Sequence, residues 1–305
     1  MPLSLTPLAP DAIHRLVRMA LDEDAPWGDL TSQSLIPSDV RITAQLAARE
    51  DGILCGEDIF TAAMSLTNPA ITTRFYLHDG EAFTAGTILA TIEGPAQAIL
   101  QAERVALNFT QRLSGIATIT SHYVAAAAAG ANTRNSESPN LESQISAPRI
   151  VDTRKTTPGL RLIERYAVRC GGGHNHRFSL SDAVMAKDNH LAIVASTGVN
   201  ITDALQSLRN KLPHTTHIEV EVDRPDQIET ILAAGADTIL LDNFTTPQLT
   251  AAVKQIAGRA LVEASGGITL PRLREIAATG VDIISVGALT QNVRSLDLGL
   301  DIQTQ

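Results

Sequence analysis

The stretch Ile218-Glu-Val-Glu-Val222 decides the fold class of this 305-residue chain, because it is the first of four similar runs. The other three are Thr238-Ile-Leu-Leu241, Ala260-Leu-Val-Glu263 and Ile283-Ile-Ser-Val286. Short apolar runs of this kind are typical of buried strands. Helical patterns fill the gaps near 225–234, 247–257 and 269–279. Recurring strand–helix units predict an α/β fold with a parallel sheet, either barrel-like or doubly wound.

Polar residues or glycine gather where each of these strands ends. They are Glu221, Asp242 with Asn243, Glu263 with Ser265, and Gly287. In β/α barrels the functional site lies at the C-terminal ends of the strands. Each turn alone is better explained as a helix cap, but the repetition at four successive strands favours a barrel. It also predicts a site for a phosphorylated sugar and its metal.

Composition narrows the classes of function. The net charge of −9 argues against a nucleic-acid or anionic-membrane binder. Residues 149–190 nevertheless contain eight Lys/Arg against four Asp/Glu, which predicts a local pocket for a polyanion. Cys55 and Cys170 form neither a disulfide framework nor a metal-ligand spacing, so we expect reduced thiols in the cytoplasm. The N-terminus lacks a signal-peptide pattern, and no apolar stretch reaches membrane-spanning length.

The first part of the chain mixes helices and strands. The patterns predict a helix at 11–23 and strands at 40–48, 70–78 and 86–93. They then predict a helical region at 94–129, with a break at Ser114-Gly115, and an exposed loop at 131–148.

Two sets of residues suit anion binding. Ser265-Gly266-Gly267 and Gly287-Ala288 resemble the phosphate-binding turns of barrel proteins, where glycine lets backbone N–H groups approach the phosphate. The second set is cationic: Arg154, Lys155, Arg177 and Lys187. The arginine fork matches two carboxylate oxygens, so several such contacts could hold a dicarboxylic acid. By contrast, Cys170 to Arg177 fits neither a dinucleotide-binding motif nor a zinc site.

Longer motifs in the chain resemble one family closely. They include Asp152-Thr-Arg-Lys-Thr-Thr-Pro-Gly159, Tyr166-Ala-Val-Arg-Cys-Gly-Gly-Gly173, Asn175-His-Arg177, Lys187-Asp-Asn-His190, Leu241-Asp-Asn-Phe244 and Glu263-Ala-Ser-Gly-Gly267. Together they are similar to quinolinate phosphoribosyltransferase, from Gly28-Asp-Leu-Thr31 to Leu289. The resemblance implies an N-terminal α/β sandwich at 1–110, joined by the C-terminal segment 290–305. It also implies an open, incomplete α/β barrel at 111–289, with 131–148 as an inserted loop.

The resemblance also implies the reaction and the roles of residues. Quinolinate and phosphoribosyl pyrophosphate would give nicotinate mononucleotide, pyrophosphate and CO2 with Mg2+. The implied quinolinate pocket consists of Arg154, Lys155, His176, Arg177 and Lys187, with Thr153 as a nearby polar contact to the substrate and Arg104 from the partner subunit of a homodimer. The implied catalytic residues are Lys155, Glu221 and Asp242, the last two beside the ribose and the metal. The implied 5′-phosphate site consists of Ser265, Gly266, Gly267, Gly287 and Ala288.

Two positions depart from the family pattern. The polar segment 133–147 is longer than the usual link, and Ser179 stands where the pattern has Gly. Two other functions compete: a paralogue that ribosylates a different acid, and a non-catalytic phosphate-ligand binder on the same barrel. The complete cationic set disfavours the first, and the joint presence of Glu221 and Asp242 counts against the second.

Overall fold

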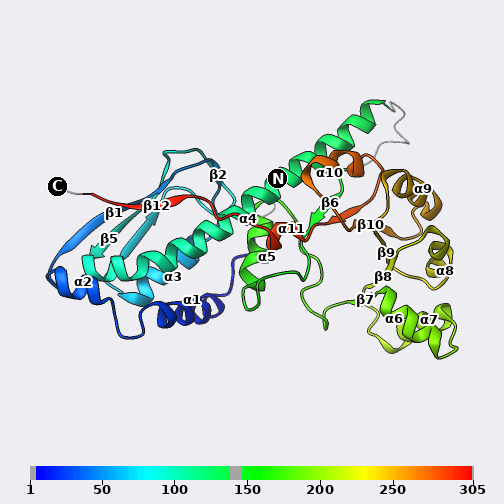
Figure 1. The fold of residues 1–305 in the computed structure, drawn as a ribbon, viewed down its shortest axis with the longest axis horizontal. Coiled ribbons are helices and arrows are strands. Elements are labelled where there is room, and N and C mark those ends of the chain that lie inside the picture. The colour runs from blue at the N-terminus through cyan, green and yellow to red at the C-terminus, as the bar shows by residue number, and fades with distance from the viewer. Residues whose placement is uncertain (1–4, 138–145, 304–305) are drawn as a thin grey trace. The chain divides into compact units, whose positions relative to one another are not determined.

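The computed structural model describes residues 5–137 and 146–303, which pack as two compact units (Figure 1). The first unit contains the chain up to Ser121, the segment Thr157–Gly172 and the chain from Asn292 onward. The second contains His122–Thr156 and Gly173–Gln291. The chain therefore passes between the units four times, once inside the Asp152–Gly159 motif. The resemblance places one boundary near residue 110, whereas the units part within a helix at Ser121.

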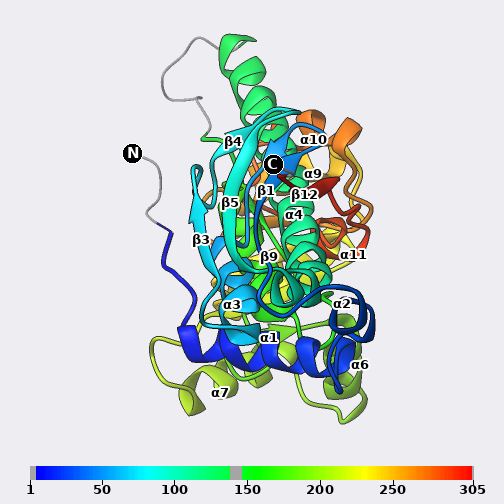
Figure 2. The ribbon, with the colours of Figure 1, turned by 90° about the vertical axis from the view of Figure 1, so that its left-hand side faces the viewer.

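The first unit is built on an antiparallel sheet. Its elements are α1 (Pro10–Asp24), α2 (Leu30–Leu35), β1 (Arg41–Ala48), β2 (Gly52–Ile53), α3 (Glu57–Thr67), β3 (Thr72–Phe75), β4 (Ala82–Phe83), β5 (Ile88–Pro95), the start of α4 (Ala96–Glu137), α5 (Arg161–Cys170) and β12 (Leu298–Ile302). The four-stranded sheet has the order β12-β1-β5-β3, and Figure 2 shows β3, β5 and β1 side by side. The C-terminal strand joins this sheet through β1, with Leu46 opposite Leu300. The predicted helix at 11–23 and the strands at 40–48 and 86–93 are confirmed as α1, β1 and β5.

Helix α4 differs from the prediction in two ways. It runs unbroken through Ser114-Gly115. Packing explains why a glycine stands inside the helix, since a Cβ atom at Gly115 would lie 2.3 Å from the Arg294 carbonyl oxygen. The glycine thus permits a close backbone approach instead of ending the helix. The helix also continues to Glu137, so the exposed loop predicted at 131–148 is wrong for 131–137. Arg134 donates there to the carbonyl oxygens of Ala278 and Thr279, a tertiary contact that stabilises this end. Positions 138–145 of that loop lie outside the described residues.

The second unit is built on a parallel sheet. After the end of α4 it contains β6 (Arg149–Val151), β7 (Val184–Ala186), α6 (Asp188–Ser196), α7 (Ile201–Lys211), β8 (Ile218–Val222), a short 3-10 turn (Pro225–Gln227), α8 (Ile228–Ala233), β9 (Thr238–Asp242), α9 (Thr246–Ile256), β10 (Leu261–Ser265), α10 (Leu270–Ala277), β11 (Ile283–Ser285) and α11 (Ala288–Gln291). Helices α8, α9 and α10 lie on one side of the strands (Figure 1). The predicted alternation of strands and helices is confirmed.

The sheet order β6-β11-β10-β9-β8-β7 is that of an incomplete barrel. Chain order and spatial order agree around the ring, and the β6–β7 pair that would close it is absent from the described strands. At the open edge of β6, Val151 forms an isolated parallel bridge with His174. The open α/β barrel that the resemblance implies is therefore present. No helix among the described residues is long and apolar enough to span a membrane.

Candidate active site

Alternate residues of the parallel strands face opposite sides of the sheet, which places the polar residues on one side. On β8, β9 and β10 the residues Val220, Leu241 and Ala264 are buried apolar positions. The opposite series ends with a polar residue on each strand: Glu221, Asp242 and Ser265. Ser265 and Asp242 are direct partners in the ladder between β10 and β9. The sheet thus gathers the predicted strand-end residues at one edge of the barrel.

The segment Thr153–Lys155 lies beside the turn after β11. A Cβ atom at Gly287 would lie 3.2 Å from Lys155 Cδ and 3.7 Å from Thr153 Oγ1. Thr153 Oγ1 accepts the backbone N–H of Lys155 at 3.1 Å, and Thr290 of α11 donates to the Lys155 carbonyl oxygen at 2.7 Å. These contacts bring Thr153, Lys155 and Gly287 together and fix the backbone of the lysine.

Two carboxylates of the strand-end edge already have partners. Lys187 Nζ forms an ion pair with Glu221 Oε2. Asp242 Oδ2 accepts the amide of Asn243 at 2.7 Å. Beside them, Gly266 has a φ of +83°, and a Cβ atom there would meet Asn243 Oδ1 at 2.3 Å. Only glycine fits this position. This supports the prediction that 265–267 form a phosphate-binding turn, against the alternative that they only cap the next helix.

Arg154 and Arg177 lie close enough to repel each other. Burial lowers the pKa of Arg177 first, and the like charge of Arg154 lowers it further, against the carboxylates of Glu219 and Asp182. Arg177 Nη1 donates to the Ala183 carbonyl oxygen at 2.9 Å. Cations gathered at the cost of repulsion are typical of a site for an anion.

His176 lies between two buried glutamates, Glu263, which was predicted as a strand-end residue, and Glu219, which was not. Its Nε2 is 3.0 Å from Glu219 Oε2 and 3.5 Å from Glu263 Oε1. Only 4% of Glu219 and 2% of Glu263 is exposed, although each carries a charged group. Burial lowers the pKa of His176, but the contacts with the two glutamates and their negative charges outweigh burial and raise the pKa to about 10. Burial likewise raises the pKa of Glu219.

The neighbouring backbone shows which ring nitrogen of His176 accepts a hydrogen bond. His176 Nδ1 accepts the backbone N–H of Arg177 at 2.7 Å, which requires a lone pair on Nδ1. The charges of Glu219 and Glu263 favour a second ring hydrogen, but that hydrogen would point at the Arg177 N–H, so the geometry favours a neutral ring with its hydrogen on Nε2. In the same cluster, Glu219 Oε1 and Glu263 Oε1 are buried without a hydrogen-bond partner.

Asp152, the first residue of the Asp152–Gly159 motif, is fully buried and holds the backbone around His176. Its Oδ1 accepts the His176 N–H at 2.9 Å, and its Oδ2 accepts the Asn175 side-chain amide. His176 and Arg177 line a cavity of about 450 Å³ together with Glu219, Glu263 and the first residues of β6, β9 and β11. These two predicted site residues thus lie deeper in the barrel than the strand-end edge.

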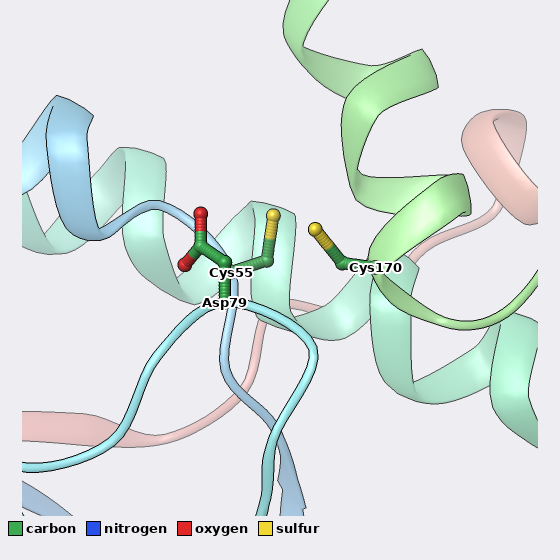
Figure 3. Close-up of side chains that lie close together, drawn as sticks. All are labelled: Cys55, Asp79 and Cys170. Carbon is green, nitrogen blue, oxygen red and sulfur yellow. The ribbon is translucent and has the colours of Figure 1, made fainter. Parts of the chain in front are cut away.

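A second cluster of metal-ligating groups lies in the first unit. The ligand atoms of Cys55, Asp79 and Cys170 lie within 4.8 Å of one another, and Figure 3 shows the two sulfur atoms side by side. Asp79 is already saturated: it accepts the N–H groups of Gly56 and Glu57, which begin α3, and the Tyr166 hydroxyl. Burial raises the pKa of the Cys55 thiol, which keeps it protonated. This arrangement is structural.

Arg104, the remaining predicted residue, lies exposed on α4 in the first unit. The roles of Arg104 and of the other residues toward ligands remain predictions. Glu219 and Glu263 had one visible signal in the sequence, since each stands two residues before a predicted site residue on the same strand face.

Comparison with known proteins covers nearly the whole chain. The model of the quinolinate phosphoribosyl transferase C-terminal domain matches residues 116–301, and that of the N-terminal domain matches residues 29–114. A carboxylating nicotinate-nucleotide pyrophosphorylase of Mycobacterium leprae (strain TN) is 39% identical over 298 residues, covering 96% of this chain and 98% of the relative. A relative from Bacillus subtilis (strain 168), a probable enzyme of the same name, is 41% identical over 290 residues, covering 95% of this chain and 93% of the relative.

Solved structures agree with this assignment. A nicotinate-nucleotide pyrophosphorylase from Francisella tularensis is 36% identical, with a TM-score of 0.86, and covers 99% of this chain and 100% of that one. Both domain models, full-length relatives and the open barrel point the same way. The chain belongs to the quinolinate phosphoribosyl transferase family.

Proposed function

We propose that this chain transfers the phosphoribosyl group of phosphoribosyl pyrophosphate to quinolinate, with release of pyrophosphate and CO2, to give nicotinate mononucleotide. Membership of the family supports the proposal, because relatives bear the name of this activity. The observation that carries it is the proximity of Arg154 to Arg177, whose pKa is lowered by the like charge of Arg154. Quinolinate has two carboxylates to offer them.

In this proposal the acid binds to Arg154, Lys155, His176, Arg177 and Lys187. The partner subunit of a homodimer contributes Arg104, whose exposure on α4 leaves its guanidinium available. A charge-assisted hydrogen bond contributes about 1.5–3 kcal/mol, so several of them would discriminate against an acid with one carboxylate. In the free protein Lys187 is paired with Glu221, and a substrate carboxylate would compete for the lysine.

The phosphosugar binds at the strand-end edge. Ser265, Gly266, Gly267, Gly287 and Ala288 would receive the 5′-phosphate through backbone N–H groups. Glu221 and Asp242 lie where positive charge develops as pyrophosphate leaves the ribose carbon, and they would stabilise that charge. The same oxygen ligands suit Mg2+, which keeps several waters and would neutralise the departing pyrophosphate.

The protein mainly positions the reactants. Attack by the pyridine nitrogen on the ribose carbon leaves the nitrogen positively charged. Loss of the adjacent carboxylate as CO2 then leaves an electron pair on the ring carbon, which the cationic nitrogen stabilises until a proton from water forms the C–H bond of nicotinate mononucleotide. No side chain needs to act as a nucleophile, and orientation by the cationic residues is the main contribution. Lys155, whose backbone is held by Thr290, supplies positive charge at this centre.

One assay tests the proposal. Purified protein is supplied with quinolinate, phosphoribosyl pyrophosphate and Mg2+, and CO2 and nicotinate mononucleotide are measured. We expect equal amounts of both products. Turnover of nicotinate but not of quinolinate would identify a paralogue for another acid, and ligand binding without turnover would identify a binding protein. The buried, unpaired thiols of Cys55 and Cys170 suit a reducing compartment, and we propose that the reaction occurs in the cytoplasm.

A further inference from the structure

We propose that Glu219 is a positioning residue that sets the tautomer and orientation of His176 and, through His176, the backbone that presents Arg177. The inference rests on the proposed function for its effect on quinolinate. Its structural part, the state of the His176 ring, stands apart from any activity.

Two contacts of the His176 ring determine which of its nitrogen atoms carries the hydrogen. The Arg177 amide donates to Nδ1 at 2.7 Å, so the ring hydrogen resides on Nε2. Nε2 is 3.0 Å from Glu219 Oε2, within the range of a charge-assisted hydrogen bond. Without an acceptor at Nε2, the alternative tautomer would point a hydrogen from Nδ1 at the Arg177 amide. Glu219 therefore secures the ring form that the Arg177 backbone needs.

The backbone of the same segment is held independently by Asp152. This carboxylate accepts the His176 N–H, so the segment is fixed on the main-chain side by Asp152 and on the ring side by Glu219. Arg177 follows directly, and its guanidinium is further held by the Ala183 carbonyl oxygen. An arginine binds a planar carboxylate through two parallel hydrogen bonds, which require a defined orientation. A fixed backbone at Arg177 helps to provide that orientation.

The contacts agree better with a positioning role for Glu219 than with a metal site at His176 or a purely structural role for Glu219. A metal ion bound to His176 Nε2 would need the hydrogen on Nδ1, where it is normally donated to an acceptor, yet Nδ1 here receives a hydrogen bond. A purely structural role for Glu219 is disfavoured because a buried carboxylate with an unpartnered oxygen is costly. Leu240 of the neighbouring strand β9 lies on the same face of the sheet as Glu221 and Glu263, so an apolar side chain can occupy this face of the barrel.

The experiment compares two replacements of Glu219 with one of Glu263. Glu219→Gln keeps an oxygen that can accept from Nε2, whereas Glu219→Met removes the acceptor at similar volume. Glu263→Gln is the matched control, because Glu263 lies 3.5 Å from Nε2, beyond a good hydrogen bond. For each variant, KM for quinolinate, KM for phosphoribosyl pyrophosphate and kcat are measured. The 15N shifts of histidine-labelled protein report the tautomer, with His176→Gln assigning the signal.

We expect the Met variant to raise KM for quinolinate about tenfold, the cost of one hydrogen bond, with KM for phosphoribosyl pyrophosphate changed less than about twofold. The two Gln variants should stay within about threefold of the parent for both substrates. The shifts should show hydrogen on Nε2 in the parent and a mixture of tautomers in the Met variant.

Hydrogen on Nδ1 in the parent would overturn the inference, even where Glu219→Met does not fold. Equal losses for both substrates would overturn it too. Absence of quinolinate turnover in the parent would instead contradict the proposed function, while the tautomer still tests the inference.

Discussion

Two clusters of three titratable side chains lie in different units of this protein and differ in how their polar atoms are satisfied. Cys55, Asp79 and Cys170 lie in the unit with the antiparallel sheet, and both oxygens of Asp79 are occupied by backbone and tyrosine donors. His176, Glu219 and Glu263 lie in the barrel unit, and two of their carboxylate oxygens have no partner. A saturated cluster stabilises the fold, whereas an unsaturated one beside a cavity retains capacity for a ligand. Replacement of the proposed ligand-binding residues of the barrel unit should therefore alter turnover, and changes in the cysteine cluster should alter stability.

The largest effect is expected at the strand-end edge. Glu221→Gln removes a negative charge beside the developing positive charge of the ribose, so kcat should fall by roughly 10²- to 10³-fold. The melting temperature should change little, because the ion pair with Lys187 is partly exposed. Steady-state kinetics and calorimetry measure both. Glu229→Gln on the surface of α8 is the control, and an equal loss there would contradict the assignment.

Disruption of the saturated cluster should show the opposite pattern. Asp79→Ala removes the acceptor for the first N–H groups of α3 and leaves the Tyr166 hydroxyl without its partner. We expect a loss of about 3 kcal/mol in the free energy of unfolding, with both KM values unchanged. Urea denaturation measures the loss, and Asp22→Ala, at an exposed position of α1, serves as the control. A large change in KM of Asp79→Ala would contradict the assignment of the cysteine cluster to stability alone.

Arg177→Ala should separate the two substrates. Loss of a charge-assisted contact should raise KM for quinolinate by about 30-fold and leave KM for phosphoribosyl pyrophosphate within about twofold. Substrate titrations at fixed Mg2+ provide both constants. Lys254→Ala, an exposed cation near the end of α9, should change neither. Equal rises in both KM values would show that Arg177 does not belong to the acid pocket.

The smallest effect concerns pH. Burial raises the pKa of Asp79 more than its hydrogen bonds lower it, so the folded protein holds this proton more tightly than the unfolded chain. Stability from that proton is full below the unfolded pKa of about 3.9 and is lost as pH rises through the folded pKa. Asp79→Asn cannot ionise and should gain stability relative to the parent as pH rises from about 4 to 7, by less than about 1 kcal/mol. Unfolding curves at several pH values should show this slope, and a slope of the opposite sign would contradict it.

Sequence patterns predicted the parts of the fold that depend on local periodicity. The strands β8 to β11 follow from short runs rich in apolar residues, the helices between them follow from helical periodicity, and the glycine turn at 266–267 follows from residue type. Helix α4 shows where this fails. Gly115 was interpreted as a break because glycine destabilises helices by about 1 kcal/mol, yet the close approach of the Arg294 carbonyl requires it there. No local pattern could reveal a neighbour almost 180 positions away in the chain.

By itself, the sequence determined the α/β class, the strand-end carboxylates and the cationic motifs, because each depends on residue type and short-range spacing. Only the tertiary structure decided which of these residues meet. It separated Glu221, Asp242 and Ser265 at the strand ends from His176 and Arg177 deeper in the barrel. It also placed Glu219 and Glu263 against His176, although 43 and 87 positions separate them from it in the chain. The physical reason is that strand register and barrel curvature, set by long-range pairing, fix where side chains converge.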